Sequence, residues 1–170
     1  MDNFYELGSL DKRGEIYLSA LVEYDDQALK RGDFKPSEPF HVKISEGKKL
    51  YDLVRYQDPF NFAVSCKFND LLKSSGLSGW RTYPILIEGS QEEYFGFQVL
   101  GRSGLLKRPK VAGFVVGCEF DHNSWDGSDF FMPLGTMSIF CTEKAKQVLT
   151  SQKFSNIGFE DIKSVKWYST

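Results

Sequence analysis

The densest group of polar side chains in the sequence runs from Cys118 to Asp129 (CEFDHNSWDGSD), and it is the first place to look for a metal site. A calcium loop needs oxygen ligands at its first, third and fifth positions, glycine at the sixth and glutamate at the twelfth. Counted from Asp121, the fifth position is tryptophan, the sixth aspartate and the twelfth methionine, so this pattern fails. Zinc needs several Cys or His ligands, and the stretch offers only Cys118 and His122. The sequence therefore predicts no metal and no other cofactor.

Catalysis by a cysteine nucleophile is the second chemistry that the residue types allow. The chain has three cysteines, Cys66, Cys118 and Cys141, and two histidines, His41 and His122. A thiol becomes a nucleophile when a histidine meets it in space. Cys66 and Cys141 stand among apolar residues where a strand leads into a helix, which favours inert thiols. We expect a protein that is not an enzyme, and a cysteine-dependent enzyme stays open as an alternative.

Length and charge restrict the class of protein further. The 170 residues predict one domain, 1–170, and 15 phenylalanines are enough for a real core. A formal charge of -2 gives no overall attraction to phosphate backbones or anionic lipids, so neither a nucleic acid nor a membrane is expected as a partner. The acidic start of the chain and three widely spaced cysteines indicate a cytoplasmic protein.

Hydrophobic patterning predicts more strands than helices. A helical turn is expected from Asp25 to Lys30, ending near Gly32, and the segment 102–110 is expected to be a basic loop. The expected strands are 15–24, 39–44, 80–87, 94–100, 111–120, 136–141 and 157–162.

Two segments that start 77 residues apart, 64–85 and 141–162, have the same layout. Ser65 and Thr142 are both of the type that caps a helix N-terminus, and Gly79 and Asn156 are the two residue types that best tolerate a positive φ. The apolar spacing between them predicts a helix of roughly ten residues. We therefore expect an α+β fold, a mostly antiparallel sheet with two related strand-helix-strand units near 58–88 and 123–165. Accidental agreement between two ordinary units is the alternative.

Short motifs in the second unit resemble those of a known family. Trp125-Asp126-Gly127-Ser128-Asp129-Phe130-Phe131 is similar to the W-x-G-x-D-F-F stretch of bacterial immunity proteins of polymorphic toxin systems. Cys141-Thr142-Glu143-Lys144 resembles their V-[ST]-E-[RK] helix start, and Asn156-Ile157-Gly158-Phe159 resembles their closing N-[VI]-x-F strand. The first half is similar in kind at 64–67 and 77–80, although Cys66 stands where the family has an acidic residue, and the paired CxxC motifs of one branch are absent.

The resemblance implies a non-catalytic cytoplasmic protein that binds a cognate protein toxin and blocks it. A tryptophan among carboxylates combines an anchor with steering charges, so we expect the contact surface at Asp121, Asn123, Trp125, Asp126 and Asp129. In a structural alternative, Trp125 and Asp129 tie this loop to the core. A ligand-binding or scaffold domain is the other function that stays open, and the sequence leaves the oligomeric state open.

Overall fold

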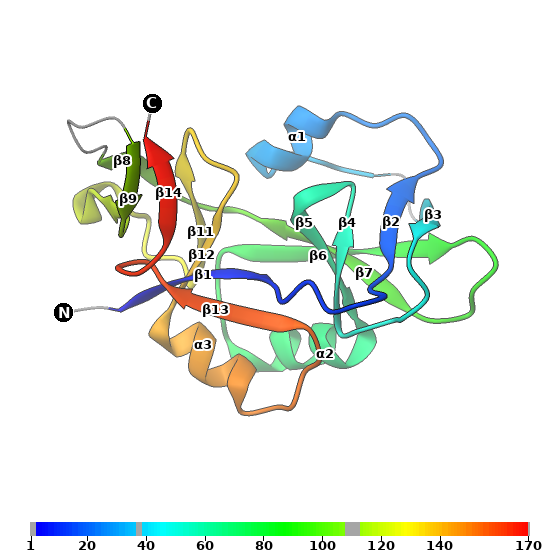
Figure 1. The fold of residues 1–170 in the computed structure, drawn as a ribbon. Coiled ribbons are helices and arrows are strands. Elements are labelled where there is room, and N and C mark those ends of the chain that lie inside the picture. Colours follow the sequence, from blue (N-terminus) through cyan, green and yellow to red (C-terminus); the bar gives the residue numbers. More distant parts are fainter. Residues whose placement is uncertain (1–2, 37–38, 108–112, 170) are drawn as a thin grey trace.

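Two β-structures lie side by side in the computed structural model, which describes residues 3–36, 39–107 and 113–169 (Figure 1). The first is a closed six-stranded barrel, and the second is an open six-stranded sheet. Helices α2 (Cys66–Ser75) and α3 (Glu143–Thr150) lie together on one side, and the short helix α1 (Asp26–Arg31) lies on the opposite side. The fold is α+β and rich in antiparallel strands, as the sequence predicts.

The chain begins in the open sheet, then forms all six strands of the barrel, and then returns to the open sheet. The barrel has the order β2 (Tyr17–Ala20), β3 (Phe40–Glu46), β6 (Trp80–Ile87), β7 (Tyr94–Val99), β5 (Asp58–Ser65) and β4 (Leu53–Tyr56). The open sheet has the order β10 (Glu119–Phe120), β8 (Gly101–Lys107), β11 (Phe130–Leu134), β12 (Ile139–Thr142), β1 (Phe4–Ser9) and β13 (Ile157–Asp161). A two-stranded ribbon of β9 (Gly113–Val116) and β14 (Lys166–Ser169) stands beside the open sheet.

The two longer helices begin where the sequence predicts. The Ser65 hydroxyl accepts the Phe68 N–H at 3.3 Å, and the Thr142 hydroxyl accepts the Ala145 N–H at 3.2 Å, so each satisfies a free donor of the first turn. The helices end earlier than predicted, with C-caps at Gly76 and Ser151, and Gly79 and Asn156 lie beyond these caps with φ angles of +84° and +65°. Within the described residues, no helix has both the length and the apolarity that crossing a bilayer requires.

In each strand-helix-strand segment, a further strand lies between the two strands. Strand β7 lies between β5 and β6, and strand β1 lies between β12 and β13. Val64 pairs with Phe95 and Trp80 with Val99, while the residues 77 positions further on, Cys141 and Ile157, pair with Tyr5 and Ser9. Strand β7 directly follows β6 along the chain, whereas β1 comes from the start of the chain and joins it to β12 and β13.

Aromatic side chains fill the barrel. The rings of Phe40, Tyr56 and Tyr83 lie with centroids 6.3 to 6.5 Å apart, at angles typical of favourable aromatic pairs. The Tyr83 hydroxyl donates to the Tyr56 hydroxyl oxygen at 3.2 Å. Burial raises the pKa of both phenols above the ordinary value, so both stay protonated at neutral pH. The Tyr83 ring lies against Gly96, whose missing side chain leaves room for it.

Two of the predicted elements are wrong. The segment 102–110 is predicted to be a loop, yet Gly101–Lys107 forms β8, because it pairs in parallel with β11. Residues 111–120 were expected to form one strand, and the described part is broken into β9 and β10 by Gly117, which has a φ of +87°. Residues 108–112 lie outside the described residues.

Gly96→Ala tests whether packing inside the barrel sets the stability of the fold. An added Cβ would lie 2.2 Å from the Tyr83 ring, so we expect a loss of about 1–3 kcal/mol in the free energy of unfolding. Urea denaturation measures it. Gly8→Ala is the matched control in β1, because a Cβ there meets nothing within 4 Å. Equal stability of the two variants would contradict this account of the barrel.

Candidate functional site

The loop between β10 and β11, residues 121–129, begins with a turn held by its own side chains. Asp121 caps the short 3₁₀ helix η1 (His122–Ser124), and its carboxylate accepts the Asn123 N–H at 3.0 Å. The rings of His122 and Phe120 stack with centroids 4.6 Å apart. The side chains of Asp121 and Asn123 are exposed to solvent.

The middle of the loop is bound to the edge of β8. The Ser124 hydroxyl accepts the Gly104 N–H at 2.7 Å, and one Asp126 carboxylate oxygen accepts the Arg102 N–H at 2.8 Å. The other Asp126 oxygen accepts the Ser128 N–H at 2.9 Å. These bonds satisfy backbone donors of a strand and a turn, so the loop has one defined conformation while Asp126 stays exposed.

Trp125 faces inward and is only partly exposed. The centroid of its indole lies 5.2 Å from that of the Phe4 ring and 5.6 Å from that of the Phe131 ring. Trp125 thus packs against the hydrophobic cluster of the open sheet. The indole N–H donates to the Ser128 carbonyl at 3.1 Å. The contacts of Trp125 therefore anchor the loop to the core.

Asp129 is only 7% exposed and joins the two halves of the chain. Its carboxylate accepts hydrogen bonds from the Ser78 N–H at 2.9 Å, the Ser78 hydroxyl at 3.2 Å and the Thr142 hydroxyl at 3.0 Å, and it pairs with Lys144 at 3.2 Å. Burial alone would raise the pKa of Asp129, but the bonds from Ser78, Lys144 and Thr142 outweigh it, so the pKa lies below its usual value.

Asp52 makes equivalent contacts with the roles of the two helices exchanged: it binds Ser65, the N-cap of α2, and Ser155, which follows α3. Its carboxylate accepts hydrogen bonds from the Ser155 N–H at 2.7 Å, the Ser155 hydroxyl at 2.8 Å and the Ser65 hydroxyl at 2.8 Å. Burial would raise the pKa of Asp52, whereas the Ser155 and Ser65 bonds, with the charge of Lys67, hold it below the usual value. We call these two arrangements the Asp52 clasp and the Asp129 clasp.

The five predicted contact residues thus divide into two groups. Asp121, Asn123 and Asp126 share one exposed loop surface, whereas Asp129 and much of Trp125 serve internal contacts. Sequence reasoning missed Ser78 and the whole Asp52 clasp. The 77-residue offset contained the signal, because it relates Asp52 to Asp129 and Ser78 to Ser155.

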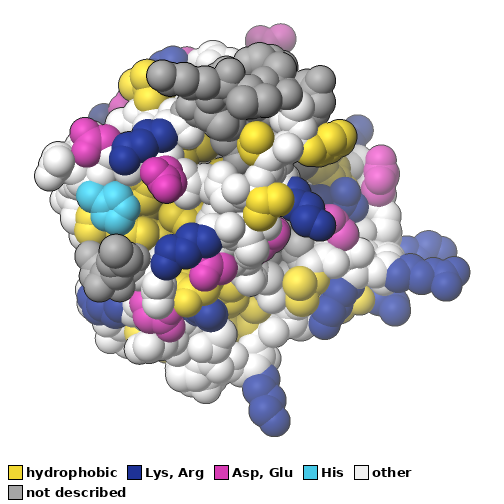
Figure 2. Space-filling view, turned by 60° about the vertical axis from the view of Figure 1, so that its left-hand side comes forward, with side chains coloured by type: hydrophobic (Ala, Val, Ile, Leu, Met, Phe, Trp, Pro, Cys, Tyr) yellow, Lys and Arg dark blue, Asp and Glu magenta, His cyan; other side chains and the backbone are white. Residues whose placement is uncertain are grey.

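Charges on this side of the molecule are mixed. Figure 2 turns the side that carries η1 forward, and acidic and basic side chains alternate there with exposed apolar ones. Lys107 lies 3.8 Å from Glu119 beside the loop, an exposed pair of opposite charges. A partner would therefore meet separate charged points on this side rather than a field of one sign.

No metal centre or reactive thiol stands out in the part of the chain that the structure describes. Its His, Cys, Asp and Glu side chains form no group of three or more that could hold a metal ion. Burial raises the pKa of the Cys118 thiol to about 11 and also raises the pKa of Cys141. Cys66 is partly exposed, and burial with the nearby carboxylates Asp70 and Glu93 raises the pKa of its thiol.

Comparisons with known proteins identify no relative: no family matches the chain, and a search of curated proteins finds no match. The geometry of the loop and of the clasps therefore carries the functional argument.

The two clasps predict how stability depends on pH. An Asp whose pKa is lowered by folding stabilises the fold in full above the unfolded value of about 3.9, and this contribution is lost as the pH falls through the folded pKa. Asp52→Asn and Asp129→Asn should each lower the free energy of unfolding at pH 7 by roughly 1.5–3 kcal/mol, and the difference from wild type should shrink towards pH 3. Urea denaturation at several pH values measures both.

Asp11→Asn is the control for this prediction. Asp11 is exposed, and asparagine tolerates its positive φ, so the stability should not change. A difference between Asp129→Asn and wild type that persisted undiminished at pH 3 would show that shape, not charge, explains the loss.

The thiols are expected to react slowly. Because each of the three thiols has a raised pKa, little thiolate is present at pH 7.5, and iodoacetamide should label none of them faster than free cysteine. Mass spectrometry of the time course measures this. Asp70→Asn should speed the labelling of Cys66, since it removes a neighbouring negative charge. One rapidly labelled cysteine in the wild type would favour the cysteine-dependent enzyme instead.

Proposed function

We propose that this protein is a non-catalytic immunity-type protein that binds a cognate bacterial toxin in the cytoplasm and blocks it. The observation that carries the proposal is the loop 121–129, which keeps the motif residues of the resemblance and combines a fixed backbone with exposed polar side chains. Asp126 and Ser124 bind the edge of β8 while Asp121, Asn123 and Asp126 face solvent.

A fixed loop suits tight binding for an energetic reason. Ordering a flexible loop on binding opposes association, and a loop that is already ordered avoids that cost. The exposed carboxylates of Asp121 and Asp126 would pair with cationic side chains of the toxin at separate points. Trp125 and Asp129 act in this proposal mainly as supports that hold the exposed residues in position.

We also propose that the two strand-helix-strand units near 58–88 and 123–165 are related copies. The matching clasps support this, because each Asp binds the cap of its own helix and the serine of the other unit. The equal registers of β1 and β7 give the same indication. Chance agreement of a helix cap is common, but it would not reproduce a reciprocal set of hydrogen bonds so readily.

One feature favours a second function, the binding of a small molecule. A groove of about 570 Å³ lies between the ends of β1, β12 and β13, and Glu6 and Glu160, which are direct partners on neighbouring strands, line it together with Arg55. Native mass spectrometry of the purified chain would detect a retained ligand, and such a ligand in a protein that neutralises no toxin would favour this function.

Co-expression tests the toxin proposal. The toxic C-terminal region encoded by a neighbouring gene is expressed in a sensitive bacterium with and without this chain, and restored growth with a copurifying pair is expected. Asn123→Arg should weaken the complex by roughly tenfold or more, because it places a large cation on the exposed loop where no side-chain bond is lost.

Gln27→Arg on α1 is the matched control, since Gln27 is equally exposed and lies on another side of the molecule. It should bind like the wild type. Equal affinity of Asn123→Arg and Gln27→Arg would remove the loop from the interface, and failure to rescue growth from any neighbouring toxin would remove the function itself.

A further inference from the structure

Six exposed cationic side chains gather at one end of the molecule. They come from the β1–β2 loop, the β3–β4 loop, the start of α2 and the loop after α3. We call this surface the basic end, and its members are Lys12, Arg13, Lys48, Lys49, Lys67 and Lys153.

Backbone hydrogen bonds fix the first four of these residues together. The carbonyl of Gly14, in the β1–β2 loop, accepts the Lys48 N–H at 3.0 Å and the Lys49 N–H at 2.8 Å from the β3–β4 loop. Gly47, with a φ of +77°, brings the second loop so close to Glu15 that a Cβ there would lie 1.9 Å from the Glu15 carbonyl oxygen. Only glycine permits this approach, so the loop positions are rigidly defined.

Two further contacts join the remaining cations to these loops. The Lys12 N–H donates to the Asn156 side-chain oxygen at 3.2 Å, which ties the first loop to the segment that carries Lys153. The Asp52 clasp joins the same segment to the start of α2, where Lys67 stands. The cluster therefore depends on tertiary contacts between residues more than 100 positions apart.

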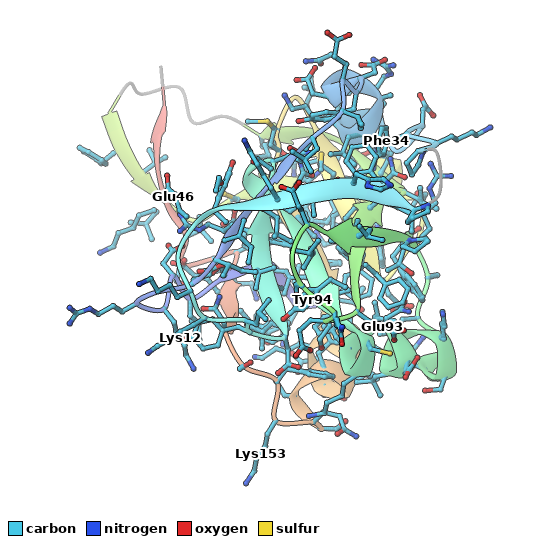
Figure 3. All side chains as sticks on the ribbon, turned by 90° about the vertical axis from the view of Figure 1, so that its right-hand side faces the viewer. Lys12, Phe34, Glu46, Glu93, Tyr94 and Lys153 are labelled. Carbon is cyan, nitrogen blue, oxygen red and sulfur yellow. The ribbon has the colours of Figure 1, made fainter. Side chains whose placement is uncertain are left out.

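Two of the six cationic side chains lie over aromatic rings. The Lys12 ammonium lies 5.8 Å from the centre of the Tyr51 ring, and the Lys67 ammonium lies 4.9 Å from the centre of the Phe154 ring. Such contacts hold a cation without neutralising it. In Figure 3, Lys12 and Lys153 project away from the ribbon on the lower part of the molecule.

None of these six cations has an acidic partner within ion-pair distance among the described residues. Several cations elsewhere are paired, as with Lys30 and Asp26, Lys107 and Glu119, and Lys144 and Asp129. The whole chain has a formal charge of -2, so a cationic cluster here leaves an acidic excess on the rest of the surface. Like charges held together on fixed loops oppose folding, and a partner of opposite charge would relieve their repulsion.

We propose that the basic end is a docking surface for the acidic surface of a partner protein. A protein fits better than a nucleic acid, because a long polyanion would also meet the acidic remainder of the molecule. One face of the Tyr51 ring and one of the Phe154 ring are already covered by lysines, which reduces the area on which bases could stack. The surface is separate from the loop 121–129 and does not depend on the partner being a toxin.

Fluorescence anisotropy tests this proposal with two probes of equal charge, a labelled oligoglutamate peptide and a labelled single-stranded oligonucleotide, at low salt. The wild type should bind the peptide, and the double variant Lys48→Glu/Lys49→Glu should bind it at least about tenfold more weakly. Both lysines contribute only backbone hydrogen bonds to the loops, so the fold should persist, which circular dichroism checks.

The control is Lys163→Glu/Lys166→Glu, which changes the net charge equally at exposed positions near the ribbon of β9 and β14. It should bind the peptide like the wild type. Equal losses in the two double variants would mean a general effect of net charge, and no loss in either would place the peptide elsewhere; both results overturn the proposal. Tighter binding of the oligonucleotide than of the peptide would also overturn it and assign the surface to nucleic acid.

Discussion

The exchange of carboxylate hydrogen bonds between the two halves is the constraint on which the rest of this structure depends. Asp52 and Asp129 each bind the cap of the helix in their own half and the serine that follows the helix in the other half. A charged acceptor in a shielded position forms strong bonds, and each lost bond would leave a donor without a partner. The clasps therefore hold both helices, and the strands that precede them, at one separation.

One middle strand completes each strand-helix-strand segment. Strand β1 lies between β12 and β13, and β7 lies between β5 and β6. The halves then differ in what encloses them. In the first half, β3 pairs with β6 and closes a barrel around aromatic side chains, whereas the corresponding sheet stays open and the loop 121–129 covers its end through Trp125 and Phe4.

The two clasps also fix the residues that carry the basic end and the loop 121–129. Because the Asp52 clasp fixes the segment after α3, it sets the positions of Lys67 and Lys153 relative to the loops that carry Lys12 and Lys48. The Asp129 clasp fixes the start of β11, where the loop 121–129 ends. The two clasps thus support two proposed contact surfaces, the loop 121–129 and the basic end, and a substitution at one need not disturb the other.

The sequence by itself determined the features that neighbours in the chain decide. Ser65 and Thr142 marked the helix starts correctly, because an N-cap is a local property, whereas the helices end at Gly76 and Ser151, ahead of Gly79 and Asn156. Only the tertiary structure decided the rest: β8 is a strand because β11 pairs with it, and Asp129 is buried while Asp126 is exposed although three positions separate them. Strand pairing and burial depend on residues far along the chain, so no local pattern specifies them.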